Sequence, residues 1–311
     1  MISIAICSHD RSEDVALCLQ AVAPQMSDHS SELVIVDSCS APQHADALRL
    51  LASTYRARLV RLETPGHSLA RNAALHESRG EWVAYLDDDA QAFPNWLTAL
   101  NNAIEIGGVN LAAVGGLTAP GWPDQPAPNH ISPRWLFYLS CIQDQARRSV
   151  RQGAKVCGAN LAFQREKLLS LGGFRNELGR IGDRLIGGEE TLAVRLLLRE
   201  GFEVMYEPSV RVTHRIHRER LTKEWISKRA YWEGVTETAM VKATGEPFPR
   251  NLSRPKLAAS ALLFGSLYAA TGNPDFMIRS RIAAGALSAR LKPITPPFPA
   301  NQTQVKATSG G

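Results

Sequence analysis

The strictest constraint in this sequence is the alternation of short apolar runs with amphipathic segments in its first part. The runs at 2–6, 33–36, 59–62 and 82–86 have the length and composition of buried strands. Three segments between them repeat apolar residues at the spacing of one helical face. Because strands that alternate with helices build a parallel sheet with right-handed crossovers, the sequence predicts an α/β fold with a Rossmann-like half.

Polar residues mark the predicted helix starts. Ser12 is expected to cap the first helix, and Ser68 to cap a helix over 69–78. No Gly-x-Gly-x-x-Gly motif follows the first strand, which argues against a dinucleotide cofactor. The buried face of the first helix is predicted to carry Val15, Cys18, Leu19 and Val22.

Three consecutive carboxylates, Asp87, Asp88 and Asp89, directly follow the fourth strand. Ligands of open α/β sheets bind beyond the carboxyl ends of the strands, and carboxylates crowded there repel one another unless a cation lies between them. Mg²⁺ or Mn²⁺ suits such oxygen ligands and keeps positions open for substrate phosphates. The alternative is a solvated acidic turn in which Asp89 or Asn95 caps the next helix.

Composition narrows the possible classes of protein. Apolar residues make up 44% and charged residues 21% of the 311 positions, as expected of a soluble protein with a large core. The net charge of +5 suits an anionic ligand or surface but is too small to indicate nucleic acid as a partner. Five cysteines without paired spacing, and the lack of a signal-peptide pattern, favour a cytoplasmic location.

The second half of the chain is less regular. Gly187-Gly188-Glu189-Glu190 is predicted to open a helix that ends at Gly201, because acidic residues stand in its first turn and basic residues near its end. After residue 221 the sequence is helical in character. Strands are predicted at 112–116 and 158–163, with a further strand at 202–206 and its edge neighbour at 210–214, and an irregular excursion at 120–133.

The order of these motifs resembles a known family. In chain order they are the polar turn from Ser8 to Arg11, Asp37 after the second strand, Gly66-x-x-x-Ala70-Arg71-Asn72, the carboxylate triplet, Glu189-Glu190 at a helix start, and His214 after a late strand. Over residues 1–220 they resemble the family 2 inverting glycosyltransferases of GT-A fold. The resemblance implies a mixed, mostly parallel sheet flanked by helices, with a C-terminal helical extension.

The resemblance also implies residues that bind a nucleoside diphosphate sugar, with UDP-sugars as the favoured donors. Arg71 and Asn72 would lie near the base and the ribose, and Asp88 would be a helper or spacer in the same group. The remaining nucleotide contacts implied by the motifs are Ser8, His9, Arg11, Asp37 and Asp87. Read without the resemblance, Asp37 is an Asx-turn residue and Arg71 a solvated charge on a helix.

A metal site and a general base are implied in the same way. Asp89 would be the firmer ligand of Mn²⁺ or Mg²⁺, with Asp87 closer to the ribose, and His214 would contact the metal or the diphosphate. Taken singly, His214 is equally well explained as a structural histidine. The basic group at 215–220 would hold the diphosphate or a lipid head group, or form a solvated surface.

Glu190 matches the second acidic residue of the Glu-Asp pair that supplies the base in this family. Glu189 stays a competing assignment, because this chain has Glu-Glu where the family commonly has Glu-Asp. During transfer the departing diphosphate gains negative charge, while a carboxylate on the opposite face of the sugar takes the proton of the acceptor hydroxyl, which inverts the anomeric centre. The alternative is that both glutamates merely complement the helix dipole.

The predicted organisation is a glycosyltransferase domain over 1–220, a helical extension over 221–292 and a disordered tail over 293–311. Within the first domain, 1–116 would bind the nucleotide sugar and 117–220 would carry the acceptor and catalytic half. The acceptor would be a saccharide or a lipid-linked molecule, and the oligomeric state is left open. The apolar run at 257–270 is interpreted as ordinary helix packing, with a peripheral membrane contact as the alternative.

Two other functions compete with sugar transfer. The chain could be a catalytically silent nucleotide-sugar binder or assembly partner, which the Glu-Glu departure keeps open. A nucleotidyltransferase is disfavoured, because such enzymes usually hold triphosphate in a glycine-rich basic loop near the first strand and this chain has none.

Overall fold

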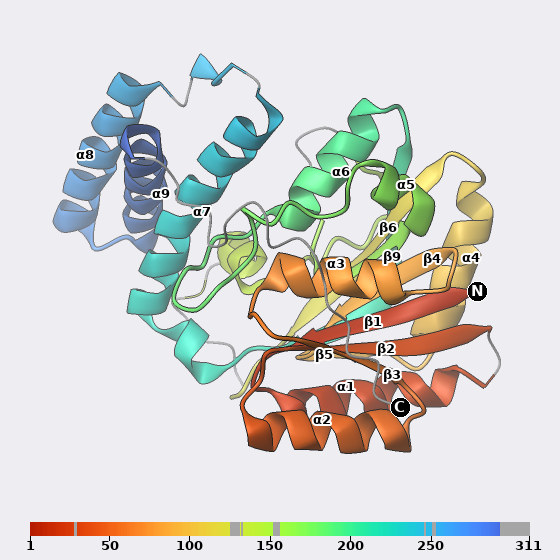
Figure 1. The fold of residues 1–311 in the computed structure, drawn as a ribbon. Helices are drawn as coiled ribbons and strands as arrows, with labels where there is room; N and C mark the ends of the chain where they lie inside the picture. Colours follow the sequence, from red (N-terminus) through yellow and green to blue (C-terminus); the bar gives the residue numbers. More distant parts are fainter. Residues whose placement is uncertain are drawn as a thin grey trace.

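In the computed structural model, the described residues are 1–27, 30–124, 131, 133–151, 156–245, 247–250 and 253–292. They form a nine-stranded sheet in the order β3-β2-β1-β4-β8-β6-β9-β5, with β7 beside β9. Helices cover both faces of this sheet, and a group of helices lies beside it (Figure 1). This mixed α/β architecture confirms the predicted fold class.

The first four strands follow the predicted alternation. β1 (Ile2–Ser8) pairs in parallel with β2 (Ser31–Ser38) and with β4 (Trp82–Asp87), and β2 pairs in parallel with β3 (Arg58–Leu62). The carboxyl ends of these strands therefore meet at one edge of the sheet. There the register sets Ser8 beside Asp37.

Alternating side chains explain why the sheet is covered on both faces. Ile2, Ile4 and Ile6 belong to one core, together with the helices α1 (Ser12–Val22), α2 (Pro42–Thr54) and α4 (Trp96–Gly107). Ala5 belongs to the core of the opposite face, which holds α3 (His67–Glu77), α5 (Arg165–Ser170) and α6 (Glu189–Arg199).

Both predicted serine caps are wrong. Ser12 is the first residue of α1, and its hydroxyl lies 3.0 Å from Nδ1 of His44 instead of bonding the helix terminus. Ser68 lies in the first turn of α3, and its hydroxyl donates to the carbonyl of Leu178 at 2.6 Å. In both cases a tertiary partner takes the hydroxyl that the local sequence assigns to the helix start.

The predicted pair of strands at 202–206 and 210–214 is also wrong, because one strand, β9 (Glu203–Arg215), runs through both segments. A register shift opposite Gly116 and Leu117 absorbs the residues between Glu207 and Arg211 without reversing the chain. β9 pairs with β6 (Leu111–Gly121), with the unpredicted β5 (Ala90–Ala92) and with β7 (Arg148–Ser149). β8 (Asn160–Gln164) is antiparallel to β4 and β6.

After residue 221 the described part of the chain is mostly helical, as predicted. α7 (Lys223–Thr244), α8 (Arg254–Thr271) and α9 (Pro274–Leu291) follow one another, and α9 packs between the other two (Figure 1). Among the described residues, no helix combines the length and the apolar content that crossing a bilayer requires. Three short 3₁₀ helices complete the described elements, η1 (Ala23–Gln25), η2 (Pro133–Leu139) and η3 (Arg218–Leu221).

Some predictions are not tested by this structure. The predicted disordered tail from 293 and half of the predicted excursion at 120–133 lie outside the described residues. The division into domains at residue 220, and into halves at residue 116, stays a prediction.

Two glycines allow α7 and α9 to cross closely. A Cβ on Gly234 would lie 1.9 Å from the carbonyl oxygen of Ile282, and a Cβ on Gly285 would lie 1.9 Å from the carbonyl oxygen of Tyr231. Carbon and oxygen atoms do not approach that closely, so any side chain at either position would push the two helices apart.

We expect Gly234→Ala to lower the free energy of unfolding by about 1–3 kcal/mol, because the added methyl group meets backbone and not a flexible side chain. Gly265→Ala in α8 is the matched control, since the nearest atom, Oγ of Ser280, lies 3.4 Å from the added Cβ. Urea unfolding followed by circular dichroism measures both variants. An unchanged midpoint for Gly234→Ala would contradict the close crossing.

Candidate active site

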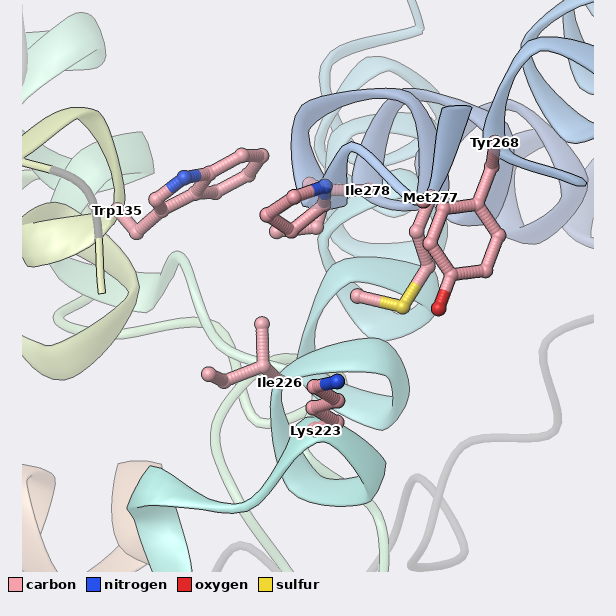
Figure 2. Close-up of a pocket in the computed structure, with 8 residues that line it drawn as sticks. Trp135, Lys223, Ile226, Tyr268, Met277 and Ile278 are labelled. Carbon is pink, nitrogen blue, oxygen red and sulfur yellow. The ribbon is translucent and has the colours of Figure 1, made fainter. Parts of the chain in front are cut away.

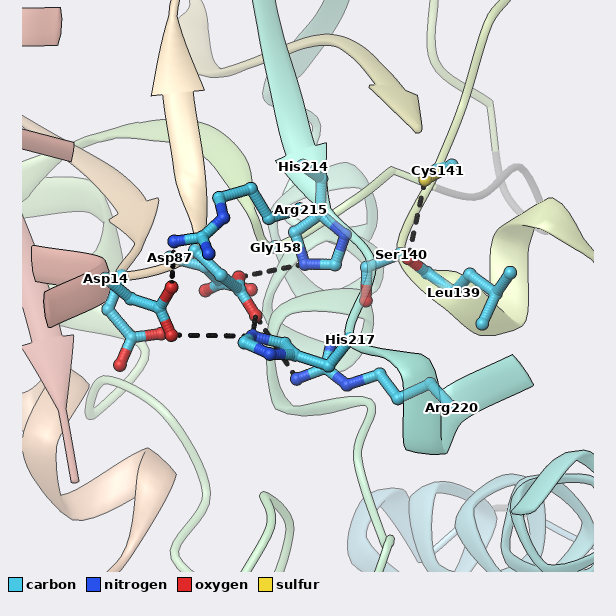
Figure 3. Close-up of polar contacts among 12 residues, drawn as sticks. Asp14, Asp87, Leu139, Ser140, Cys141, Gly158, His214, Arg215, His217 and Arg220 are labelled. Atoms are coloured by element: carbon cyan, nitrogen blue, oxygen red, sulfur yellow. Dashed lines mark hydrogen bonds and ion pairs between the residues drawn. The ribbon is translucent and has the colours of Figure 1, made fainter. Parts of the chain in front are cut away.

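The carboxylate triplet lies where β4 leaves the sheet, as predicted, and β9 brings basic groups to it. Asp87 ends β4, and Asp89 precedes Ala90, which pairs with His214 in the ladder between β5 and β9. The backbone N–H of Arg215 donates to the carbonyl of Asp89 at 2.8 Å. Figure 3 shows His214 and its basic neighbours converging on the carboxylates.

Asp89 has more partners than the other two aspartates. Its Oδ1 lies 2.9 Å from Nε2 of His214, and its Oδ2 accepts from Arg220 at 3.2 Å. Arg11 also donates to Oδ2, at 3.3 Å, and Nε2 of His217 lies 3.6 Å from the same oxygen. Burial opposes ionisation, but these basic neighbours, His214 first, hold the pKa of Asp89 well below its usual range. Asp89 therefore stays charged although it is buried.

The side chain of Asp88 bonds residues at the end of β1 and just after it. Its Oδ2 accepts from the hydroxyl of Ser8 at 2.8 Å, and its Oδ1 accepts from Arg11 at 3.3 Å. Burial, and then the charge of Asp89, raises the pKa of Asp88 to about 7. The predicted nucleotide contacts Ser8 and Arg11 thus lie at the triplet and are bonded to it.

Arg71 lies between the triplet and the predicted base. Its Nη1 donates to Oε1 of Glu189 at 3.0 Å, and its Nη2 donates to Oδ1 of Asp87 at 3.2 Å and to the carbonyl of Gly158 at 3.0 Å. Burial lowers the pKa of Arg71, but Glu189 and Asp87 raise it more, so the net shift is upward. Burial likewise opposes the ionisation of Asp87, and Arg71 outweighs it, so the pKa of Asp87 is lowered.

The two glutamates at the start of α6 differ in environment. Gly188, with φ of 87°, adopts the left-handed conformation that glycine tolerates without strain, and the helix begins at the next residue. The Glu189 side chain is 4% exposed and paired with Arg71, whereas the Glu190 side chain is 16% exposed and lies 3.9 Å from Arg71. Burial, and then the charge of Glu189, raises the pKa of Glu190 to about 8.

Sequence reasoning missed two basic residues beside these acids. Nε2 of His67 lies 3.4 Å from Glu189, and burial, followed by the charge of Arg71, lowers the pKa of His67 to about 4. The carbonyl of Arg180 accepts from the backbone of His67 at 3.2 Å. Burial, with Arg220 next, lowers the pKa of Arg180 to about 10. His67 directly follows Gly66, the first residue of the motif that contains Arg71, so the sequence could have placed His67 at the site. Arg180 stands in an irregular loop whose sequence shows no pattern.

Three other predicted nucleotide contacts lie apart from the acidic cluster. Nδ1 of His9 lies 2.8 Å from the carbonyl of Ser38, so His9 sits between the ends of β1 and β2. Asp37 accepts from the backbone of Ser40 at 2.8 Å and pairs with Arg61. The side-chain amide of Asn72 donates to the carbonyl of Phe174 at 2.8 Å and holds the loop before α6.

The donor set at the triplet fits a divalent cation. Asp87, Asp89 and His214 each offer one ligand atom, and these atoms lie within 4.8 Å of one another. Nδ1 of His214 is buried and has no hydrogen-bond partner in the described part of the chain. Carboxylate oxygens suit both Mg²⁺ and Mn²⁺, so the residues present could hold either ion.

Comparison with known proteins identifies the family. The sequence model described as Glycosyl transferase family 2 matches residues 3–171, more than half of the chain. The chain belongs to glycosyltransferase family 2. The match includes the carboxylate triplet and ends before Glu189 and His214, so the roles of those two residues rest on geometry and on the motif resemblance.

Two relatives of this family 2 glycosyltransferase have names that state a substrate or a biosynthetic product. The glucosyl-dolichyl phosphate glucuronosyltransferase of Haloferax volcanii is 27% identical over 179 residues, which cover 57% of this chain and 56% of that protein. The succinoglycan biosynthesis protein ExoM of Rhizobium meliloti is 25% identical over 303 residues, 93% of each chain. The chain therefore spans little more than half of the first relative and nearly all of the second.

Two solved structures share the fold. The mannosyltransferase PcManGT from Pyrobaculum calidifontis, in complex with GDP-Man and Mn²⁺, has a TM-score of 0.60 at 20% identity, covering 93% of this chain and 86% of that one. S. aureus TarS 1-349, in complex with UDP, has a TM-score of 0.51 at 13% identity, covering 93% and 91%. These similarities establish the GT-A type of fold.

We expect Arg71→Met to destabilise this glycosyltransferase by about 3–5 kcal/mol, because Asp87 and Glu189 would be left buried without their shared cation. Arg49→Met is the matched control, since Arg49 forms an exposed ion pair with Asp46. Thermal and urea unfolding measure both variants. Equal, small losses would show that Arg71 does not compensate the buried acids.

Proposed function

We propose that this glycosyltransferase is a metal-dependent, inverting enzyme that moves a sugar from a nucleoside diphosphate sugar to a hydroxyl acceptor. The observation that carries the proposal is the division of one buried acidic cluster into two parts by Arg71. On one side Asp87 and Asp89 offer metal ligands, and on the other Glu190 offers a carboxyl with a raised pKa.

The metal side would hold the diphosphate end of the donor. Asp87, Asp89 and His214 would hold Mn²⁺ or Mg²⁺. The bound ion would offset the negative charge that develops on the leaving diphosphate. Arg11 and Arg220, which now bond Oδ2 of Asp89, add positive charge at the same place. Both guanidinium groups can therefore support an anionic leaving group next to the metal ligands.

Glu190 is the proposed base. Arg71 pairs with Glu189 at 3.0 Å but with Glu190 only at 3.9 Å, so Glu190 is the carboxyl less committed to an ion pair. A Glu190 carboxylate oxygen would take the proton of the acceptor hydroxyl as the new bond forms. Attack from the face opposite the diphosphate inverts the anomeric centre. Glu189 would position Arg71 and set the charge around its neighbour.

The proposal also covers the class of the donor, the class of the acceptor and the location of the enzyme. Ser8, His9 and Asp37, at the ends of β1 and β2, are the proposed contacts of the base and ribose. UDP-sugars remain the favoured donors, and GDP-sugars join them because the two structural neighbours were solved with GDP-Man and UDP. A saccharide or lipid-linked hydroxyl is the proposed acceptor, in keeping with the names of the relatives. A cytoplasmic location, where thiols stay reduced, is part of the same proposal.

We expect Asp89→Ala to abolish metal-dependent transfer, and Glu190→Gln to bind the donor but transfer it about 100-fold or more slowly, because the amide cannot accept the proton. A thermal-shift panel of nucleotide sugars with Mn²⁺, Mg²⁺ or chelator measures binding, since a ligand at 100 times its Kd adds about 2.7 kcal/mol of stability. Release of nucleoside diphosphate measures transfer.

The control for Glu190→Gln is Glu200→Gln, which alters an exposed glutamate just beyond the other end of α6 and should leave both readouts unchanged. Full activity of Asp89→Ala and Glu190→Gln would overturn the assignment. Donor binding by the unaltered chain without transfer or hydrolysis across a broad acceptor panel would instead favour a silent binder.

We expect the rate of transfer to rise with pH up to about 8 and then to level off. A base acts only when it is deprotonated, and the pKa of Glu190 is raised, so its carboxylate fraction grows about tenfold per pH unit well below that value. Initial rates across a pH series measure the profile, and melting curves at each pH separate it from unfolding. A rate that is flat from pH 5 to pH 8 would contradict Glu190 as the base.

A further inference from the structure

α8 is the outermost helix of the C-terminal group. It packs on α9, which in turn packs on α7, and its far side faces away from the sheet (Figure 1). Leu257 is the one α8 residue that is buried in the described structure. Most of the surface of this helix therefore has no partner within the described chain.

The exposed side of α8 is apolar. From Leu257 to Thr271 the sequence contains no charged residue. Leu262 is 74% exposed and Leu263 is 57% exposed, and Ala259, Ser266 and Ala269 lie exposed along the same helix at helical spacing. An uncharged helical stripe with two exposed leucines is costly to leave in water. Exposed apolar surfaces of this kind bind another protein or a membrane.

Basic residues flank this stripe. Residues 253–292 contain six lysine or arginine side chains and one acidic side chain, Asp275, an excess equal to the net charge of +5 of the whole chain. Five of the basic residues are exposed. Arg279 lies over the ring of Phe264, 5.3 Å from its centre, so at least one guanidinium belongs to the α8 surface itself. The exposed basic residues are Arg254, Lys256, Arg279, Arg281 and Lys292. Arg281 lies over the ring of Tyr231 on α7, 5.4 Å from its centre, so its charge is on the side of α9 away from α8.

A cavity of about 260 Å³ opens where α8 turns into α9. Figure 2 shows Trp135, Tyr268 and Met277 around it, with the ammonium group of Lys223 pointing toward the space. Nε1 of Trp135 is buried without a hydrogen-bond partner in the described structure. Tryptophan and tyrosine beside apolar side chains and a lysine are the residues that favour the boundary between lipid head groups and acyl chains.

We propose that α8 and α9 lie in the interface of an anionic membrane, with Leu262 and Leu263 among the acyl chains and the basic residues among the lipid phosphates. An uncharged, largely apolar helix surface beside exposed basic residues suits an anionic bilayer surface, because apolar side chains enter the acyl region and cations meet the lipid phosphates.

Charge favours an anionic membrane over a second copy of the chain as the partner of this surface. Two α8–α9 surfaces in contact would bring two sets of excess positive charge together, which opposes self-association. An anionic lipid surface attracts the same charges and also buries the leucines. Vesicle binding is measured without donor or acceptor, so its outcome does not depend on sugar transfer.

We expect the full chain to float with vesicles of phosphatidylcholine mixed with phosphatidylglycerol and to bind weakly to phosphatidylcholine alone. The double variant Leu262→Ser/Leu263→Ser should lower the partition coefficient about tenfold or more, since two leucines no longer enter the acyl region. Lys256→Gln and Lys292→Gln should each lower it about fivefold and reduce its dependence on salt.

Leu50→Ser is the matched control, because Leu50 lies on α2, away from this surface, and is 70% exposed. It should float like the unaltered chain, and circular dichroism should show every variant folded. Three results would overturn the proposal: no flotation with anionic vesicles, undiminished flotation of the double leucine variant, or a dimer that this variant abolishes in the absence of vesicle binding. Light scattering after size-exclusion chromatography detects the dimer.

Discussion

The site depends on one buried guanidinium. Arg71 is 3% exposed and bonds Asp87 at the end of β4, Glu189 at the start of α6 and the carbonyl of Gly158 before β8. Carboxylates gathered at one edge of a sheet would repel each other and take up protons without such a cation. Because Arg71 joins three elements that are distant in the sequence, it sets both the charge of the cluster and the spacing of its two parts.

The second constraint is the length of β9. β6 pairs with β9 on both sides of the register shift, and the C-terminal part of β9 also pairs with β5 on its other edge. β5 begins directly after Asp89, so the ladder that pairs Ala90 with His214 brings the imidazole to that carboxylate. A hairpin at this point would have reversed the chain, and the basic residues that follow His214 could not have reached Asp89 as they do.

These two constraints explain what the sequence could and could not predict. The first four strands were predictable because each carries its own apolar run and each helix its own periodicity. β5 has three residues, too few to show a pattern, and the continuity of β9 depends on partners elsewhere in the sheet. The position of Asp89 followed from its strand. The sequence could not predict that Arg71 links the acids or that Arg180 lies beside them. Both depend on packing that brings α3 and an irregular loop together.

The presence of Glu-Glu in place of Glu-Asp acquires a physical meaning in this arrangement. Glu189 is held by Arg71, and its negative charge is one of the causes that raise the pKa of Glu190. A base with a higher pKa draws a proton more strongly but is ionised in a smaller fraction of molecules, and catalysis is best served when its pKa lies near the working pH. In the proposed mechanism Glu189 would therefore tune the pKa of Glu190. Arg71, which lies close to both, would limit how far that tuning goes.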